Sequence, residues 1–458
     1  MSFREFIPEF IVIIHFFQCG VWQALMIYLP PHLFGIDQFL PQIMGIVASV
    51  TVAVIFFSVK FHYKRVRFFH FYLLAIGNLF FVINGCYFQF DYFESIKGLY
   101  FGGVAHGLIY ITGLTYMHFR LANNEFRIFK LSLCHIFYLI GIVATVHGVE
   151  LMSGDLAEIF SKVRPVFLAT GSICFMHLLV NETLHVGGLF DYKSCRDTEL
   201  NAANDKKDLF RSALEFTPVP KMSRNNSVEH MSQAQDAAVA RKPDTRRQTF
   251  LTLLMIFSKL KNYMSSHGIF INFFVIFSND LFQERTYYIM HYLILAGALA
   301  GICITLKGNM KSIYIVSAIC VCICLLVVII FKLTSVFLIG LYSLPIILLY
   351  FHLGVSYFVP DCSIMEVSCL KFTEISLVGG YIAETVCHII TIATMKCSMF
   401  SDQDGFWHSS IIFIVILSVI CTVIFKWLPK TWSLSILEVQ HLILYNENRW
   451  TPKEQSNN

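Results

Sequence analysis

The stretch Ser312–Phe331, SIYIVSAICVCICLLVVIIF, contains no charged residue over twenty positions. A bilayer core of about 30 Å needs about 20 apolar residues of helix to cross it. Within lipid, only helices and closed barrels satisfy every backbone N–H and C=O group. This stretch therefore predicts a membrane-spanning helix, and with it a membrane protein.

Apolar stretches of this length recur along the chain, six before a polar central insert and six after it. We expect helices at about 8–29, 39–59, 68–88, 98–118, 130–149, 163–184, 265–283, 287–306, 312–331, 335–358, 373–395 and 407–428. The pattern predicts an all-α membrane protein with twelve transmembrane helices in two six-helix halves. The start of the seventh helix is the least defined, because apolar residues 250–257 precede it and Lys259 and Lys261 follow them.

Composition excludes several classes of protein. Hydrophobic residues make up 56% of the 458 residues and charged residues only 14%, which is unlike a soluble globule. The basic residues sit in short loops rather than in one stripe, so no nucleic-acid partner is expected. The 14 cysteines lie mostly in apolar segments, which favours small apolar side chains over metal ligands. No nucleophile–base motif or nucleotide loop appears, so we expect neither an enzyme nor a cofactor.

Loop charges predict the orientation. The loop after the second predicted helix carries Lys64 and Arg65, and the loop after the fourth carries Arg120 and Arg127, whereas the alternate loops lean acidic. Lys and Arg accumulate on the cytoplasmic side. We therefore expect both termini and the central insert in the cytoplasm, in a multi-pass protein of the plasma membrane.

The same pattern divides the chain into four parts. We expect an N-terminal six-helix half at 1–185, a C-terminal half at 250–429 and a cytoplasmic tail at 430–458. Residues 186–249 between the halves are polar and poor in aromatics, so they predict a largely disordered cytoplasmic linker with room for short helices.

Two segments carry a resemblance to a known family. Residues 428–440, LPKTWSLSILEVQ, resemble the segment Pro-Glu-Thr-Lys-Gly followed by Ser/Thr-Leu-Glu-Glu-Ile, which closes members of the sugar porter family of the major facilitator superfamily. Pro429, Thr431 and Glu438 fall in register with it. Residues 271–282, INFFVIFSNDLF, look like the family's seventh helix, in which Asn272 would bind the sugar. The nearest subgroup is the insect-type sugar and trehalose carriers.

The resemblance implies a twelve-helix transporter whose solute, a sugar, binds between two halves that rock against each other. His135, His267 and His352 fall at or near positions that the family uses for binding, and Gln18 is a polar residue at membrane depth. The residues expected to bind solute are Gln18, His135, His267, Asn272 and His352.

The charged cytoplasmic gate of the family is only partly preserved. Lys64-Arg65 and Arg127 keep basic positions, but the family's Glu and Arg after the tenth helix are replaced by Tyr357 and Ile364. The sequence therefore predicts basic residues that have lost their acid partners. The residues assigned to the gate and family signature are Lys64, Arg65, Arg127, Glu182, Pro429, Thr431 and Glu438.

Glu384 lies in the middle of the eleventh predicted helix. An ionisable group there costs about 2.5–3.5 kcal/mol, so its presence calls for a reason. One interpretation is an acid that couples transport to protons. The other is an acid that faces a water-filled cavity or pairs with a histidine.

Two functions follow from these patterns. The first is a transporter of a small polar solute, a sugar by resemblance, that works by alternating access. The second is a non-transporting membrane protein, such as a nutrient receptor or a scaffold, which the loss of the gate charges would favour.

Overall fold

The computed structural model describes residues 3–28, 39–62, 67–88, 92–121, 127–150, 156–183, 245–262, 285–306, 309–334, 339–368, 372–396, 403–429, 439 and 442–443. Every predicted apolar segment except the seventh coincides with a described helix. The seventh, at 265–283, lies outside the described residues. Among the described residues, seven helices are long and apolar enough to cross a bilayer.

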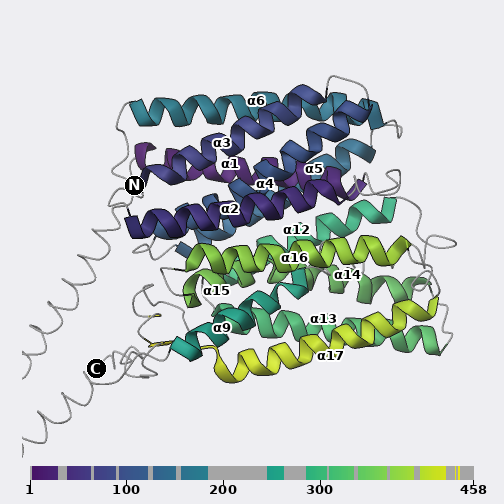
Figure 1. Ribbon diagram of the computed structural model, residues 1–458. Coiled ribbons are helices and arrows are strands. Elements are labelled where there is room, and N and C mark those ends of the chain that lie inside the picture. The colour runs from purple at the N-terminus through teal and green to yellow at the C-terminus, as the bar shows by residue number, and fades with distance from the viewer. Residues whose placement is uncertain are drawn as a thin grey trace, which may run out of the picture.

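The N-terminal half is a bundle of six helices, drawn from purple to blue in Figure 1. They are α1 (Phe3–Tyr28), α2 (Leu40–His62), α3 (Arg67–Tyr87), α4 (Tyr92–Arg120), α5 (Arg127–Glu150) and α6 (Leu156–Thr183). The helix α4 packs against α2 and α3, and α1 packs against α5. Close backbone approach depends on glycine: a Cβ atom on Gly103 of α4 would lie 2.0 Å from the carbonyl oxygen of Pro41 in α2.

The C-terminal half lies beside it and is drawn in green to yellow (Figure 1). Its described helices are α9 (Thr245–Ser258), α12 (Arg285–Thr305), α13 (Met310–Leu333), α14 (Ile339–Val355), α15 (Val359–Val367), α16 (Thr373–Lys396) and α17 (Gln403–Trp427). The crossing of α12 and α14 is again made by glycine, since a Cβ atom on Gly301 would lie 2.0 Å from the carbonyl oxygen of Val355.

The helix predicted at 335–358 is two helices in the structure, and the second one extends beyond the predicted end. The helix α14 ends at Val355, the chain turns through Ser356–Phe358, and α15 begins at Val359 with Pro360 in its first turn. Proline suits a helix start because its missing N–H would be unpaired there. All nine residues of α15 are buried, including Asp361 and Glu366. The predicted segment ended at 358, before α15, because its limits followed the apolar residues and α15 contains two acids. Both acids are nevertheless buried.

The two halves contact each other through α2 and α4 with α16 and through α5 with α12 and α15. The helices α1 and α9 begin, and α6 and α17 end, at the same end of the bundle (Figure 1). We call this the linker end. The start of α5 and the short helix α15 also lie towards it.

Candidate functional site

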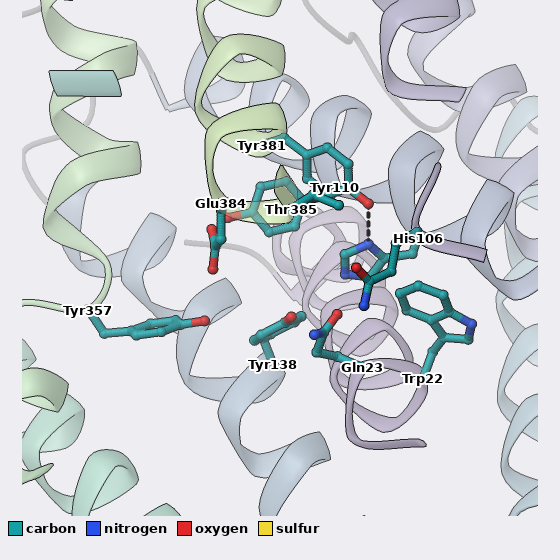
Figure 2. Close-up of a pocket in the computed structure, with 10 residues that line it drawn as sticks. Trp22, Gln23, His106, Tyr110, Tyr138, Tyr357, Tyr381, Glu384 and Thr385 are labelled. Atoms are coloured by element: carbon teal, nitrogen blue, oxygen red, sulfur yellow. Dashed lines mark hydrogen bonds between the residues drawn. The ribbon is translucent and has the colours of Figure 1, made fainter. Parts of the chain in front are cut away.

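A small cavity lies between the two halves. Its lining comes from α1, α2, α4 and α5 on one side and from α16 and the turn before α15 on the other, and Figure 2 shows most of these residues. The lining residues are Trp22, Gln23, Gln42, His106, Tyr110, Tyr138, Tyr357, Tyr381, Glu384 and Thr385. The cavity volume is about 20 Å³, which is room for a water or two. A solute of hexose size therefore enters only if the lining moves apart.

Aromatic rings form much of the cavity wall. The Trp22 ring packs on His106 with ring centroids 4.8 Å apart, and its indole Nε1 donates to the carbonyl oxygen of Leu99, 3.3 Å away. His106 Nδ1 lies 2.7 Å from the hydroxyl of Tyr381, the contact drawn as a dashed line in Figure 2. This contact joins α4 to α16 and so bridges the two halves. The wall offers both flat apolar faces and fixed polar groups.

A buried cluster of charges adjoins the cavity. Lys259 Nζ lies 2.8 Å from Asp361 Oδ2 and 2.6 Å from Glu384 Oε2. The side chains of Lys259 and Asp361 are each 1% exposed, and that of Glu384 is 15% exposed. Such burial is costly unless the charges are paired and hydrogen-bonded. Lys259 lies in the turn that follows α9, Asp361 lies on α15, and Glu384 lies on α16.

The N-terminal half completes this cluster. The hydroxyl of Tyr110 on α4 donates to Asp361 Oδ2 over 2.7 Å and accepts from Lys259 Nζ over 3.2 Å. His135 Nε2 on α5 lies 3.7 Å from the same carboxylate oxygen. Asp361 is therefore a C-terminal acid held by residues from both halves. We call Lys259, Asp361, Glu384, Tyr110 and His135 the central cluster.

A second ionic contact joins the halves nearer the linker end. Arg127, at the start of α5, donates to Glu366 Oε1 on α15 over 2.6 Å, and both side chains are at most 5% exposed. The expectation that the basic gate residues lack acid partners is therefore wrong for Arg127. The acid comes from Glu366, two residues beyond Ile364, because the turn before α15 brings this short helix against α5. At Arg127, this pair removes the observation that favoured a non-transporting protein.

Lys130, less than one turn further along α5, provides a contrast. Its Nζ lies 2.8 Å from Glu9 Oε2 on α1, so this pair stays within the N-terminal half. Two basic residues three positions apart on α5 thus form one ion pair that crosses between the halves and one that does not.

Comparison with solved structures identifies the architecture. The proton:xylose symporter XylE of E. coli, bound to 6-bromo-6-deoxy-D-glucose, matches with a TM-score of 0.60 at 15% identity, over 96% of this chain and 98% of that one. The transporter FucP in the outward conformation matches with a TM-score of 0.51 at 12% identity, over 93% and 100% of the two chains. The chain has the major facilitator fold.

A transporter of the POT family, in complex with a thioalcohol-conjugated peptide, shares the fold with a TM-score of 0.57 at 12% identity, over 92% of this chain and 96% of that one. No protein-family model matches the sequence, and no curated protein does. The prediction of an all-α membrane protein with two six-helix halves is confirmed. The chain is a multi-pass membrane protein, and the cavity occupies the place between the halves of the major facilitator fold.

The structure brings two of the predicted site residues together. Glu384 lines the cavity, and His135 lies beside Asp361 in the central cluster. Gln18 is buried near Gly171 of α6, and no atom of it lines the cavity. The backbone oxygen of His352 accepts from Lys261 Nζ over 3.3 Å, and the residue stands apart from the cavity lining.

Two of the remaining predicted residues lie at helix ends, and the others lie outside the described residues. Glu182 is in the last turn of α6, and Pro429 follows α17 by two residues. The residues outside the described ranges, which stay predictions, are Lys64, Arg65, His267, Asn272, Thr431 and Glu438.

Lys259 and Asp361 were missed as site residues. Lys259 was interpreted only as a residue between two apolar runs, and Asp361 was not singled out. A signal was present in the sequence: both are ionisable residues within four positions of apolar segments, where a charge needs a buried partner.

Proposed function

We propose that this protein is a secondary transporter that moves a small polar solute across the membrane by alternating access. The observation that carries the proposal is a polar and aromatic cavity enclosed between two halves whose contacts include a buried ion pair, Arg127–Glu366. Such a pair holds the linker end closed, and its separation would open the cavity to that side. Alternating access requires two such arrangements of similar free energy.

We further propose a sugar as the solute. Aromatic faces such as Trp22 suit the C–H surfaces of a sugar ring, while the Gln23 and Gln42 amides and the tyrosine hydroxyls suit its hydroxyl groups. Support also comes from the two sequence segments that resemble sugar porters and from XylE, whose structure holds a glucose analogue. The cavity must widen to accept a sugar. A small cavity of this kind agrees with an occluded conformation of a carrier, between its two open conformations.

Coupling to protons and the orientation complete the proposal. XylE is a proton:xylose symporter, and Glu384 is an acid at the cavity wall of this chain. We assign Glu384 as the coupling acid. The linker end is placed in the cytoplasm by its loop charges, in the plasma membrane, so that Arg127–Glu366 forms the cytoplasmic gate.

Uptake of labelled pentoses, hexoses and disaccharides into oocytes tests this function. We expect saturable uptake of at least one sugar above water-injected controls. His106→Leu removes the bond to Tyr381 in the cavity wall and should lower apparent affinity about tenfold. The matched control is His291→Leu, which changes a buried histidine of α12 outside the cavity lining and should leave affinity unchanged. Surface-expressed protein that moves no sugar of the panel would contradict the proposal.

A further inference from the structure

Among the described residues, the central cluster is one positive charge short. Two carboxylates, Asp361 and Glu384, share the single ammonium group of Lys259. The three N–H groups of that ammonium have three acceptors, the two carboxylates and the Tyr110 hydroxyl. A net negative charge buried in a dry site is unfavourable until a proton or another cation balances it. The cluster is therefore built to take up one positive charge.

The two acids are not equivalent. Asp361 Oδ2 accepts from both Lys259 and Tyr110 and lies beside His135, deep between the halves. Glu384 lines the cavity and is the more exposed of the two. A cation that arrives through the cavity therefore meets Glu384 first.

We propose that Glu384 carries one proton with each solute, and that Lys259 changes partners as it does so. This rests on the proposed transport function and adds the residues that perform the coupling. With Glu384 ionised, Lys259 bridges the two acids and the cavity is empty. When the carboxylate of Glu384 takes a proton from the water on the open side, Lys259 stays with Asp361 and Tyr110. The neutral carboxyl group of Glu384 then donates to a hydroxyl of the solute.

The cycle balances one charge. The proton bound to Glu384 crosses with the solute and returns to water on the opposite side, after which Lys259 pairs with Glu384 again. Asp361 stays ionised throughout as the fixed anchor of Lys259. In the part of the chain that the structure describes, the titratable groups that face or adjoin Glu384 are Lys259, Asp361, His106, Tyr110, His135, Tyr138, Tyr357, Tyr381 and Cys387.

Transport in proteoliposomes tests the coupling. With one proton per solute, a pH gradient of one unit should accumulate the solute about tenfold. We expect Glu384→Gln to abolish this accumulation and to slow, without abolishing, the exchange of labelled for unlabelled solute, because the Gln amide can still donate to the solute. The matched control, Glu374→Gln, changes a buried acid ten residues earlier on α16 and should keep the accumulation. Accumulation by Glu384→Gln equal to that of the unmodified protein would overturn the proposal, as would accumulation driven by a sodium gradient instead.

A second measurement is independent of the solute. Infrared difference spectra of the purified protein in lipid, recorded between acidic and neutral pH, report carboxyl groups that take up a proton. We expect a carboxyl band that Glu384→Gln lacks and Glu374→Gln retains. A band that persists in Glu384→Gln would overturn the assignment. If no sugar is transported but this band is assigned to Glu384, the proposed solute fails while the proton site stands.

Discussion

The two ionic junctions between the halves differ in their charge balance. Nearer the linker end, the ion pair described for Arg127 joins one base to one acid, Glu366, and it is buried away from the cavity lining. In the central cluster, one lysine serves two acids, and one of these acids lines the cavity. A buried pair of equal and opposite charges needs no further ion, whereas a buried cluster with an excess negative charge is stabilised by binding a proton or another cation.

This difference assigns different tasks to the two junctions. The balanced pair acts as a latch, because its free energy depends on whether the halves are together. The unbalanced cluster senses the contents of the cavity. The short helix α15 carries an acid of each, Asp361 and Glu366, so a change at one reaches the other through one rigid element.

The largest effect is expected from removing Lys259, which among the described residues supplies the ammonium group of the central cluster. Lys259→Met leaves two buried carboxylates together, and breaking a buried pair in this way costs about 3–5 kcal/mol. We expect a marked fall in the thermal unfolding temperature in detergent. The double variant Lys259→Met/Asp361→Asn removes one of the acids and should recover part of the loss. No recovery would show that charge balance does not govern this site.

Separating the latch should change the conformational equilibrium more than the folding of each half. Arg127→Met removes the guanidinium between α5 and α15, which favours the state that is open at the linker end. Each 1.4 kcal/mol changes the ratio of states about tenfold. Labelling of an introduced cysteine from the linker side measures this ratio and should rise. Lys130→Met breaks a pair within one half and should leave labelling unchanged; an equal rise in both variants would contradict the latch.

A smaller effect is expected where packing positions the central cluster. Gly301→Ala places a methyl group 2.0 Å from the carbonyl oxygen of Val355, directly before the turn that leads to Asp361. Overpacking of this kind costs about 1–3 kcal/mol. Thermal unfolding should show it. In Gly85→Ala the nearest atoms belong to the side chains of Leu168 and Phe167, at 3.1 Å, so a smaller loss is expected there.

The smallest effect is expected at an exposed pair. Lys162 and Glu158 lie one turn apart on α6, with side chains 48% and 41% exposed. Such helix-surface pairs contribute about 0.3–0.5 kcal/mol. Lys162→Ala should therefore leave the unfolding temperature almost unchanged, and a loss as large as that of Lys259→Met would show that burial does not separate the two kinds of pair.

Much of the fold could be predicted from sequence because apolar runs of about 20 residues match the thickness of the bilayer core. The predicted segment at 312–331 became α13, and that at 407–428 became α17. The tenth helix shows where this reasoning stops. Hydropathy counts Asp361 and Glu366 as the end of a span, although their partners on α4 and α5 allow burial.

The candidate site was harder to predict than the fold. Glu384 stood out because it is an isolated acid within an apolar run. Lys259 and Asp361 lie at the edges of such runs, and their pairing spans 102 positions of sequence, so no local pattern joins them. The same holds for Arg127 and Glu366, whose pairing depends on the turn before α15. Tertiary contacts of this kind require the packed structure.

The most direct test of alternating access is to join the two sides of the latch covalently. In the double variant Arg127→Cys/Glu366→Cys, a short thiol cross-linker should stop solute exchange in proteoliposomes, and cleavage of the linker should restore it. The two single-cysteine variants carry the same native cysteines and should be unaffected by the reagent. Exchange that continues at full rate in the cross-linked double variant would contradict movement of the halves about this junction.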